Sequence, residues 1–220
     1  MNTIHDLGGM DGFTLPERDQ DFPLHEDWER QIWGLALSVW AKRIPGYPGG
    51  TRADIELIPP ELYLDMPYFA KWLWAEEVSV TRGGLASRAE LSDPEGALEA
   101  PDIGNFTPAT PAEVIAFLQS YDSFEIPATV EPAFAVGDTV IVKNNHPEGH
   151  TRCPRYTRGR QGVIQKHHGV HHFQDDVEED VGQQHLYTVT FTGRELWGER
   201  GNANDLIHAE LWEYHLEPGK

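Results

Sequence analysis

Hydrophobic residues recur three and four positions apart through the first half of the chain, which is the spacing of one face of a helix. The pattern predicts helices over residues 26–43, 52–58 and 60–65, and from residue 67 onward. Ser87 with Glu90, and Thr110 with Glu113, have the spacing of capping boxes, so two further helices are expected to begin there. The first half is therefore predicted to contain helices and loops.

After about residue 127 the apolar positions alternate two residues apart, which is typical of strands. Strands are expected over residues 134–143, 162–164, 186–191 and 207–212. Short strands at this spacing, with glycine turns between them, predict a small β-barrel. The expected fold is α+β, with a helical domain over residues 1–126 and a barrel domain over residues 127–220. Residues 1–22 are glycine-rich and show no period, so we expect an extended arm that lies on another surface.

The chain is strongly acidic, and its basic residues are unevenly placed. It has 220 residues, of which 36 are Asp or Glu and 17 are Lys or Arg, giving a formal net charge of −19. The protein as a whole therefore repels nucleic acid. Residues 151–170 nevertheless contain five basic residues and no acidic one, namely Arg152, Arg155, Arg158, Arg160 and Lys166. Two interpretations stay open: this basic segment meets a local anionic partner, or its arginines pair with carboxylates elsewhere on the surface.

No apolar run approaches the length needed to span a bilayer, and residues 1–6 lack the basic and apolar stretches of a signal peptide. We therefore expect a cytoplasmic protein. Cys153 is the one cysteine of the sequence, which excludes an internal disulfide and a multi-thiolate metal site. We expect Cys153 to be a small apolar core residue.

Four histidines gather in residues 166–172, and histidine is the commonest metal ligand in proteins. Neighbouring residues of a strand point to opposite faces, however, so each adjacent pair offers one ligand per face. No Cys, Asp or Glu stands at a recognised ligand spacing from them. We therefore expect a polar turn between strands, and no metal bound by this chain.

The sequence has no nucleophile elbow, zinc-protease motif or phosphate-binding glycine loop. This absence favours a subunit or a binding module over a self-sufficient enzyme. Tyr68 and Trp72 stand four residues apart on an expected helix and so share a face. They form either the wall of a pocket or part of the core.

Several segments follow one another in an order that is typical of one protein family. They are the N-terminal stretch 4–13, the arginine-rich stretch 149–159, residues 186–189 with 195–198, and the closing residues 211–217. Together they resemble the β subunit of nitrile hydratase. The resemblance implies a helical N-terminal domain with a long arm and an SH3-like C-terminal barrel.

The resemblance also implies a partner, the nitrile hydratase α subunit, in an αβ heterodimer that pairs into an α2β2 heterotetramer. In this family the α subunit holds a low-spin cobalt or iron ion through cysteines, two of them oxidised, and the complex hydrates nitriles to amides. Tyr68 matches the tyrosine beside the substrate, and Trp72 matches an aromatic wall of the pocket. A tryptophan at the second position resembles the cobalt class, which favours cobalt over iron.

Four polar residues match positions that act on the partner's oxidised cysteines. Arg52 and Arg152 match the two arginines that hydrogen-bond the sulfenate and sulfinate oxygens. Such buried anions need neutralising, and a planar guanidinium does so with directed donors. Glu56 and His150 match outer positions whose role is to hold the arginines and their network.

The same sequence allows three alternatives to a nitrile hydratase subunit. Smaller activator proteins of this kind deliver metal to the α subunit, and in thiocyanate hydrolase the two halves are separate chains. A histidine-rich metal carrier is the third alternative. The presence of both halves in one chain favours the nitrile hydratase subunit.

Overall fold

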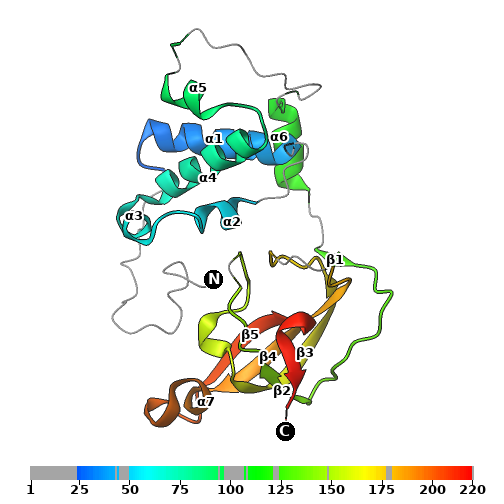
Figure 1. Ribbon diagram of the computed structural model, residues 1–220. Helices are drawn as coiled ribbons and strands as arrows, with labels where there is room; N and C mark the ends of the chain where they lie inside the picture. The colour runs from blue at the N-terminus through cyan, green and yellow to red at the C-terminus, as the bar shows by residue number, and fades with distance from the viewer. Residues whose placement is uncertain are drawn as a thin grey trace. The chain divides into compact units, whose positions relative to one another are not determined.

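The computed structural model forms two compact units, and each is described by itself (Figure 1). The structure describes residues 24–42, 44, 50–93, 95–96, 107, 109–120, 124–147, 149–176 and 180–219. The helical unit takes the described residues up to 120, and the sheet unit takes those from 124 onward. The arm expected over residues 1–22 lies outside the described residues, and the domain boundary expected after residue 126 stays a prediction.

The described part of the helical unit is built from helices and the loops between them. The helices are α1 (Asp27–Lys42), α2 (Thr51–Ile55), α3 (Pro60–Asp65), α4 (Tyr68–Arg82), α5 (Arg88–Ser92) and α6 (Pro111–Gln119). Helix α4 is central, because both α1 and α2 pack against it. The buried apolar side chains of the unit include Ala36, Leu37, Ile58, Phe69 and Ala75.

Both capping boxes are confirmed. The Ser87 hydroxyl accepts from the Glu90 backbone N–H at 3.2 Å, and the Glu90 carboxylate accepts from the Ser87 N–H at 2.7 Å. Thr110 and Glu113 make the same reciprocal pair at the start of α6. These bonds satisfy backbone donors that the first turn of a helix leaves without partners, and they fix where the two helices begin.

The sheet unit is built on an antiparallel sheet. Its strands are β1 (Glu125–Ile126), β2 (Thr139–Val142), β3 (Gln161–His171), β4 (Gln184–Thr192), β5 (Leu206–Trp212) and β6 (Leu216–Pro218). The strand order is β5-β4-β3-β2-β6, with β1 paired to β3. The α+β class is confirmed, whereas the described pairings leave the sheet open at β5 and β6.

Short helices join the strands and complete the unit. They are the 3-10 turn η1 (Arg155–Thr157), helix α7 (Gly193–Trp197), and the 3-10 turns η2 (Gly198–Arg200) and η3 (Glu213–His215). Alternate residues of the strands point into one core, which contains Val140, Val142, Ile164, Val189 and Phe191, all at most 1% exposed. This core supports the loop between β2 and β3.

Strand β3 is longer than expected. The sequence predicted a strand over residues 162–164 and a polar turn over 166–172, whereas β3 continues through His171 and pairs with β4. The turn interpretation was wrong because backbone pairing with β4, and with β1 at Val170 and His171, continues through a stretch that has no apolar alternation in the sequence. Register shifts along the pairing and a positive φ of 84° at Gly169 accommodate the irregular stretch.

Among the described residues, none of the helices has the length and apolar composition needed to cross a membrane.

Candidate functional site

Helix α2 presents Arg52 beside Glu56. The helix begins after Gly50, whose extended backbone turns the chain into the first helical residue. The Arg52 Nε–H donates to the Glu56 carboxylate at 3.1 Å, one helical turn away. The Arg52 side chain is 43% exposed, whereas that of Glu56 is 11% exposed. The inner carboxylate therefore orients an arginine that reaches the surface.

The start of helix α4 carries a cluster of aromatic side chains. Tyr68 and Trp72 share a face, as predicted, with ring centroids 5.9 Å apart. Phe69 packs beside both rings, and Trp40 of α1 lies 5.2 Å from Trp72. Tyr68 remains 64% exposed. The cluster is thus buried at one end and open to solvent at the other, as a pocket wall would be.

Glu76 continues the face of Trp72 one turn further along α4, and it is only 3% exposed. Burial, supported by repulsion from Asp54, raises the pKa of Glu76 to about 7, against smaller opposing effects of hydrogen bonds from Ser79 and Trp40. Asp54 is itself 2% exposed and belongs to α2, the helix that carries Arg52. A carboxyl group that is largely neutral below pH 7 therefore lies beneath the aromatic cluster.

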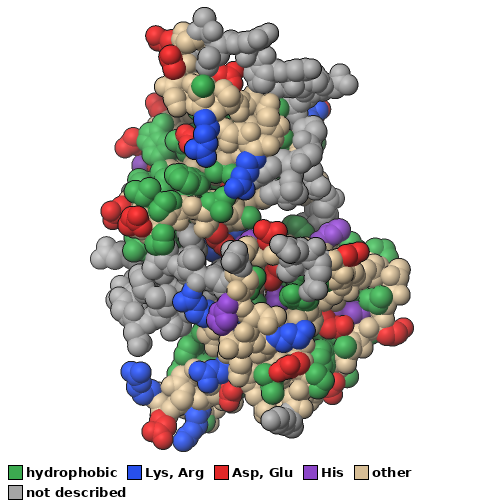
Figure 2. Space-filling view, viewed as in Figure 1, with side chains coloured by type: hydrophobic (Ala, Val, Ile, Leu, Met, Phe, Trp, Pro, Cys, Tyr) green, Lys and Arg blue, Asp and Glu red, His purple; other side chains and the backbone are tan. Residues whose placement is uncertain are grey.

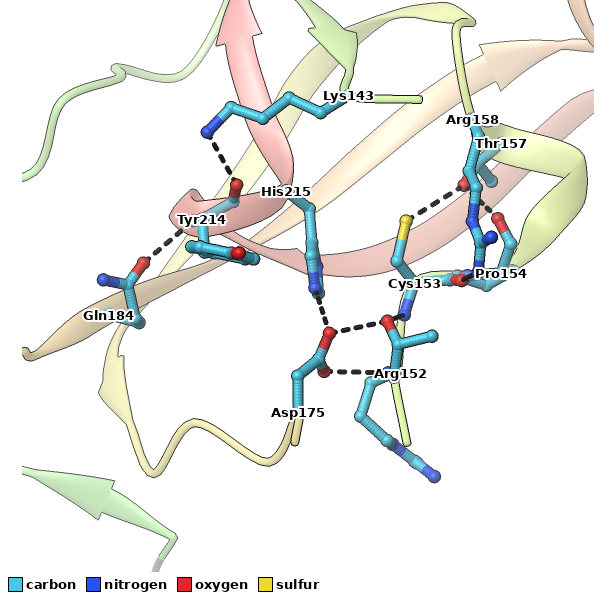
Figure 3. Close-up of polar contacts among 11 residues, drawn as sticks. Lys143, Arg152, Cys153, Pro154, Thr157, Arg158, Asp175, Gln184, Tyr214 and His215 are labelled. Atoms are coloured by element: carbon cyan, nitrogen blue, oxygen red, sulfur yellow. Dashed lines mark hydrogen bonds and ion pairs between the residues drawn. The ribbon is translucent and has the colours of Figure 1, made fainter. Parts of the chain in front are cut away.

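In the sheet unit, Arg152 lies on a loop before η1 that a single carboxylate holds (Figure 3). The Thr151 hydroxyl donates to Asp175 at 2.6 Å, and the Arg152 backbone N–H donates to the other Asp175 oxygen at 2.8 Å. The ring Nε2 of His215 contacts the first oxygen at 2.8 Å. The Cys153 N–H donates to the Thr151 hydroxyl at 3.1 Å, so three consecutive residues are tied together.

The electrostatics of Asp175 fit an ionised anchor. Its side chain is 2% exposed, and burial alone would raise its pKa. Hydrogen bonds from His215, Thr151 and the Arg152 backbone, together with the charge of His215, outweigh burial and lower the pKa of Asp175 below its usual value. These hydrogen bonds offset the free-energy cost of burying the charged carboxylate.

Arg158 fixes the far end of the same loop. It is not a surface arginine, because it is 7% exposed and donates to the Cys153 carbonyl at 2.8 Å. A second guanidinium nitrogen lies 3.1 Å from Nδ1 of His146. Arg158 is thus an internal support of the loop.

The Arg152 side chain itself points away from the Asp175–His215 pair (Figure 3). Within the described part of the chain, its guanidinium has no hydrogen-bond or ion-pair partner. His150 lies two residues before Arg152 and is half-buried, and its carbonyl accepts the Asp176 N–H at 2.8 Å. The backbone is held on both sides while the cationic head is available to an external anion.

Cys153 is 5% exposed and belongs to the core of the sheet unit. Burial raises the pKa of its thiol, against smaller effects of Arg158 and Thr157. The expectation of a small apolar core residue is confirmed.

The histidines of residues 166–172 make hydrogen bonds within the sheet. His167 Nε2 lies 2.9 Å from His185 Nδ1, and His185 Nε2 lies 3.0 Å from the Val130 carbonyl. A carbonyl only accepts, so in neutral His185 Nε2 donates to it and Nδ1 accepts from His167. His168 Nε2 contacts the Thr188 hydroxyl at 2.7 Å. Among the described residues, no group of three or more His, Cys, Asp or Glu is arranged to hold a metal ion.

The structure therefore brings the expected site residues together in separate sets. Arg52 joins Glu56, and Tyr68 joins Trp72, in the helical unit; Arg152 and His150 lie on one loop of the sheet unit. Sequence reasoning missed Asp175 and His215, which stand alone in the sequence without a motif or a spacing. Glu76 had a signal, since it interrupts the apolar face of a helix.

Two family models match the chain. The model described as "Nitrile hydratase beta subunit, N-terminal" matches residues 1–117, and "Nitrile hydratase beta subunit, C-terminal" matches residues 123–218. Both halves are therefore represented.

Known relatives match the chain along its length. It is 31% identical to the cobalt-containing nitrile hydratase subunit beta of Pseudonocardia thermophila, with 99% of this chain and 96% of the relative aligned. It is 34% identical to the low-molecular weight cobalt-containing nitrile hydratase subunit beta of Rhodococcus rhodochrous, with 99% and 100% aligned.

A partial likeness to thiocyanate hydrolase also exists. Its subunit alpha from Thiobacillus thioparus is 32% identical, over 38% of this chain and 70% of the relative. A solved structure of the recombinant apo-enzyme from the same organism has 28% identity and a TM-score of 0.38, covering 44% of this chain and 82% of that chain.

Proposed function

This chain belongs to the nitrile hydratase β-subunit family, and we propose that it completes the active site of a metal-bearing α subunit that hydrates nitriles to amides. The proposal rests above all on the full-length match of both halves to relatives of that name. The likeness to thiocyanate hydrolase covers 38% of the chain, against 99% for the nitrile hydratase relatives. A split-chain enzyme of that kind is therefore the poorer fit.

Arg52 and Arg152 are proposed to hydrogen-bond the oxygens of the partner's oxidised cysteines. The Arg152 guanidinium has no partner within the described residues, which suits an anion supplied from outside the chain. Arg52 is oriented at 3.1 Å by Glu56, in keeping with an outer, supporting role for that carboxylate. His150, two residues before Arg152 on the same loop, is proposed to play the corresponding outer role for that arginine.

Tyr68 and Trp72 are proposed to border the substrate. A nitrile is weakly polar, so it binds best against an apolar wall that excludes water. Trp72 packs on Trp40 and Phe69, which fixes its ring, and Tyr68 presents an exposed phenol at the edge of the cluster. A rigid aromatic face with one hydroxyl at its rim supplies both burial and a directed hydrogen bond.

The metal is proposed to be low-spin cobalt, or else iron, held by the α subunit. The two relatives described above are named cobalt-containing. Bound there, the ion would act as a Lewis acid or orient the attacking oxygen. The contribution of this chain is to neutralise the anionic ligand oxygens and to shape the pocket.

Exposed hydrophobic side chains on the helical unit support docking of a partner (Figure 2). The set, each member at least 36% exposed, is Trp33, Leu35, Leu57, Leu62, Leu64, Tyr68, Leu73, Leu91, Ile115, Phe117 and Leu118. Scattered apolar residues are normal on a surface, but so many on one small unit favour an interface. We propose an αβ unit that pairs into an α2β2 heterotetramer in the cytoplasm.

The sheet unit is proposed to be an SH3-like barrel that is only partly closed. After the 3-10 turn η3, the last strand β6 returns to pair with the first long strand β2. This pairing bends the meander β2–β5 back toward its own beginning, which supports the barrel topology.

Co-expression with the neighbouring α subunit tests the proposal. The complex is expected to elute from gel filtration as one species. Its αβ interface should bury more than roughly 2,000 Å². It should hydrate a simple aliphatic nitrile and contain about one cobalt or iron per αβ unit, as one centre per α subunit requires. The chain expressed alone should be inactive and metal-free. A monodisperse lone monomer that hydrates nitriles would contradict the proposal.

A further inference from the structure

One carboxylate organises the backbone on which Arg152 stands. Asp175 accepts from the Thr151 hydroxyl and the Arg152 N–H, and Thr151 in turn accepts from the Cys153 N–H. The loop lies outside the strands, so no ladder of sheet hydrogen bonds orders residues 151–153. Asp175 replaces that ladder with bonds of 2.6–2.8 Å (Figure 3).

His215 is committed to the same carboxylate. Its ring is 5% exposed and packs among Phe173, Trp212 and Tyr214, with ring centroids 5.9–6.2 Å away. Its Nε2 lies 2.8 Å from Asp175, while Nδ1 is buried without a hydrogen-bond partner in the described part of the chain. The hydrogen bond of this ring therefore serves to fix the rotamer of Asp175.

We propose that Asp175 and His215 are positioning residues for Arg152, holding the backbone so that the guanidinium meets its anion in one orientation. The inference rests on the proposed role of Arg152. An arginine side chain is long and flexible, and directed bonds to a buried anion require the guanidinium plane in a defined place. Fixing the backbone at residues 151–153 restricts the position of the Arg152 Cα atom, from which the side chain extends.

An ionised carboxylate can accept all of these contacts at once. One Asp175 oxygen receives Thr151 and His215, and the other receives the Arg152 N–H, so both oxygens act as acceptors. Asparagine has the same shape but replaces one acceptor with an NH2 donor. In one orientation that NH2 faces the Arg152 N–H; in the other it faces Thr151 and His215. Asp175→Asn therefore disturbs the loop without opening a cavity.

A double-mutant cycle in the co-expressed αβ complex tests the inference. The variants are Asp175→Asn, Arg152→Lys and the two combined, with kcat and KM measured on an aliphatic nitrile. We expect Asp175→Asn to lower kcat by on the order of tenfold or more with little change in KM, because the misplaced group acts on the chemical step. In the double variant, Asp175→Asn should lower kcat by less than about twofold beyond Arg152→Lys. Asp175 acts through the Arg152 guanidinium, which the lysine variant already lacks.

A matched control separates positioning from general destabilisation. Ile164→Val removes one buried methylene from the sheet core at a residue of β3, outside residues 151–153, and should lower Tm while leaving kcat unchanged. His215→Gln places an amide donor near the position of Nε2, and His215→Phe keeps a ring without a donor. We expect Gln to retain most of the activity and Phe to lose it at equal metal content. The two His215 variants test the positioning role even if the Asp175→Asn complex does not assemble.

The outcomes distinguish a failure of the positioning role from a failure of the proposed function of Arg152. Fully multiplicative losses in the double variant, wild-type kcat in Asp175→Asn, or equal activity of His215→Gln and His215→Phe would overturn the positioning role while leaving Arg152 in place. Wild-type activity of Arg152→Lys would instead overturn the proposed function of Arg152, and the positioning role with it.

Discussion

Replacing each of three arginines by lysine separates directed hydrogen bonding from charge. Arg52→Lys and Arg152→Lys keep the positive charge but lose the planar fork of donors. In Arg52 the Nε–H already serves Glu56, and the terminal nitrogens carry the remaining donors. Lysine has one ammonium nitrogen at the end of a flexible stem. It can serve the carboxylate or an oxidised cysteine well, but it does not reproduce the geometry of both.

The expected size of the effect follows from the bonds at stake. Losing one charge-assisted hydrogen bond to a buried anion costs about 1.5–3 kcal/mol. Felt fully in the transition state, this lowers turnover by roughly 10- to 150-fold. Arg155 lies in the same basic segment, exposed on η1, and has no matched role, so Arg155→Lys should change turnover by less than about twofold, as surface substitutions usually do.

Turnover of an aliphatic nitrile is measured for all three complexes after gel filtration and elemental analysis have established equal assembly and metal content. Similar activity in Arg52→Lys, Arg152→Lys and Arg155→Lys would refute the reasoning. The arginines would then be ordinary surface residues of an acidic protein.

Three further predictions do not depend on the roles proposed for the arginines. The pKa of Glu76 is raised from 4.5 to about 7, so its stabilising contribution is complete below pH 4.5 and is lost as pH rises through 7. Glu76→Gln should therefore increase the free energy of unfolding more at pH 8.5 than at pH 5, by on the order of 3 kcal/mol, as urea unfolding at the two pH values would measure. Equal increases at both pH values would count against a neutral Glu76. Cys153 should be alkylated at pH 8 at least about tenfold more slowly in the native complex than in urea, as peptide mass spectrometry would report, because burial raises its pKa. Replacing the four histidines of residues 166–172 with glutamine should leave the metal content per αβ unit unchanged, and a loss of metal would restore the metal-site interpretation.

The sequence predicted the elements whose signals are local. The capping boxes at Ser87 and Thr110 gave the starts of two helices, because the bonds they make lie within one turn. Helix α1 was expected over residues 26–43 and spans Asp27–Lys42. The helix expected over residues 52–58 is shorter, ending at Ile55, because the chain turns ahead of Pro59.

What could not be predicted depends on contacts between distant residues. Asp175 and His215 are 40 residues apart and meet only when the sheet places η3 beside the Arg152 loop. The histidine segment resembled a turn because a polar strand has no apolar alternation, and its pairing with β4 involves residues far away in the sequence. For Arg152, the family resemblance predicted a role. The contacts of Asp175 and His215 that hold its loop could be identified only in the folded structure.

The anchor of Arg152 has a consequence for the order of events during synthesis. Asp175 follows Arg152 by 23 residues, and His215 follows Asp175 by another 40. At about 5–20 residues per second, those 40 residues take the ribosome roughly 2–8 seconds. A partner that docks on the helical unit as it emerges therefore meets a nascent chain whose arginine is still unplaced. The proposed docking surface is thus synthesised first, and the guanidinium proposed to bind the anion gains its anchor only after His215 has been added.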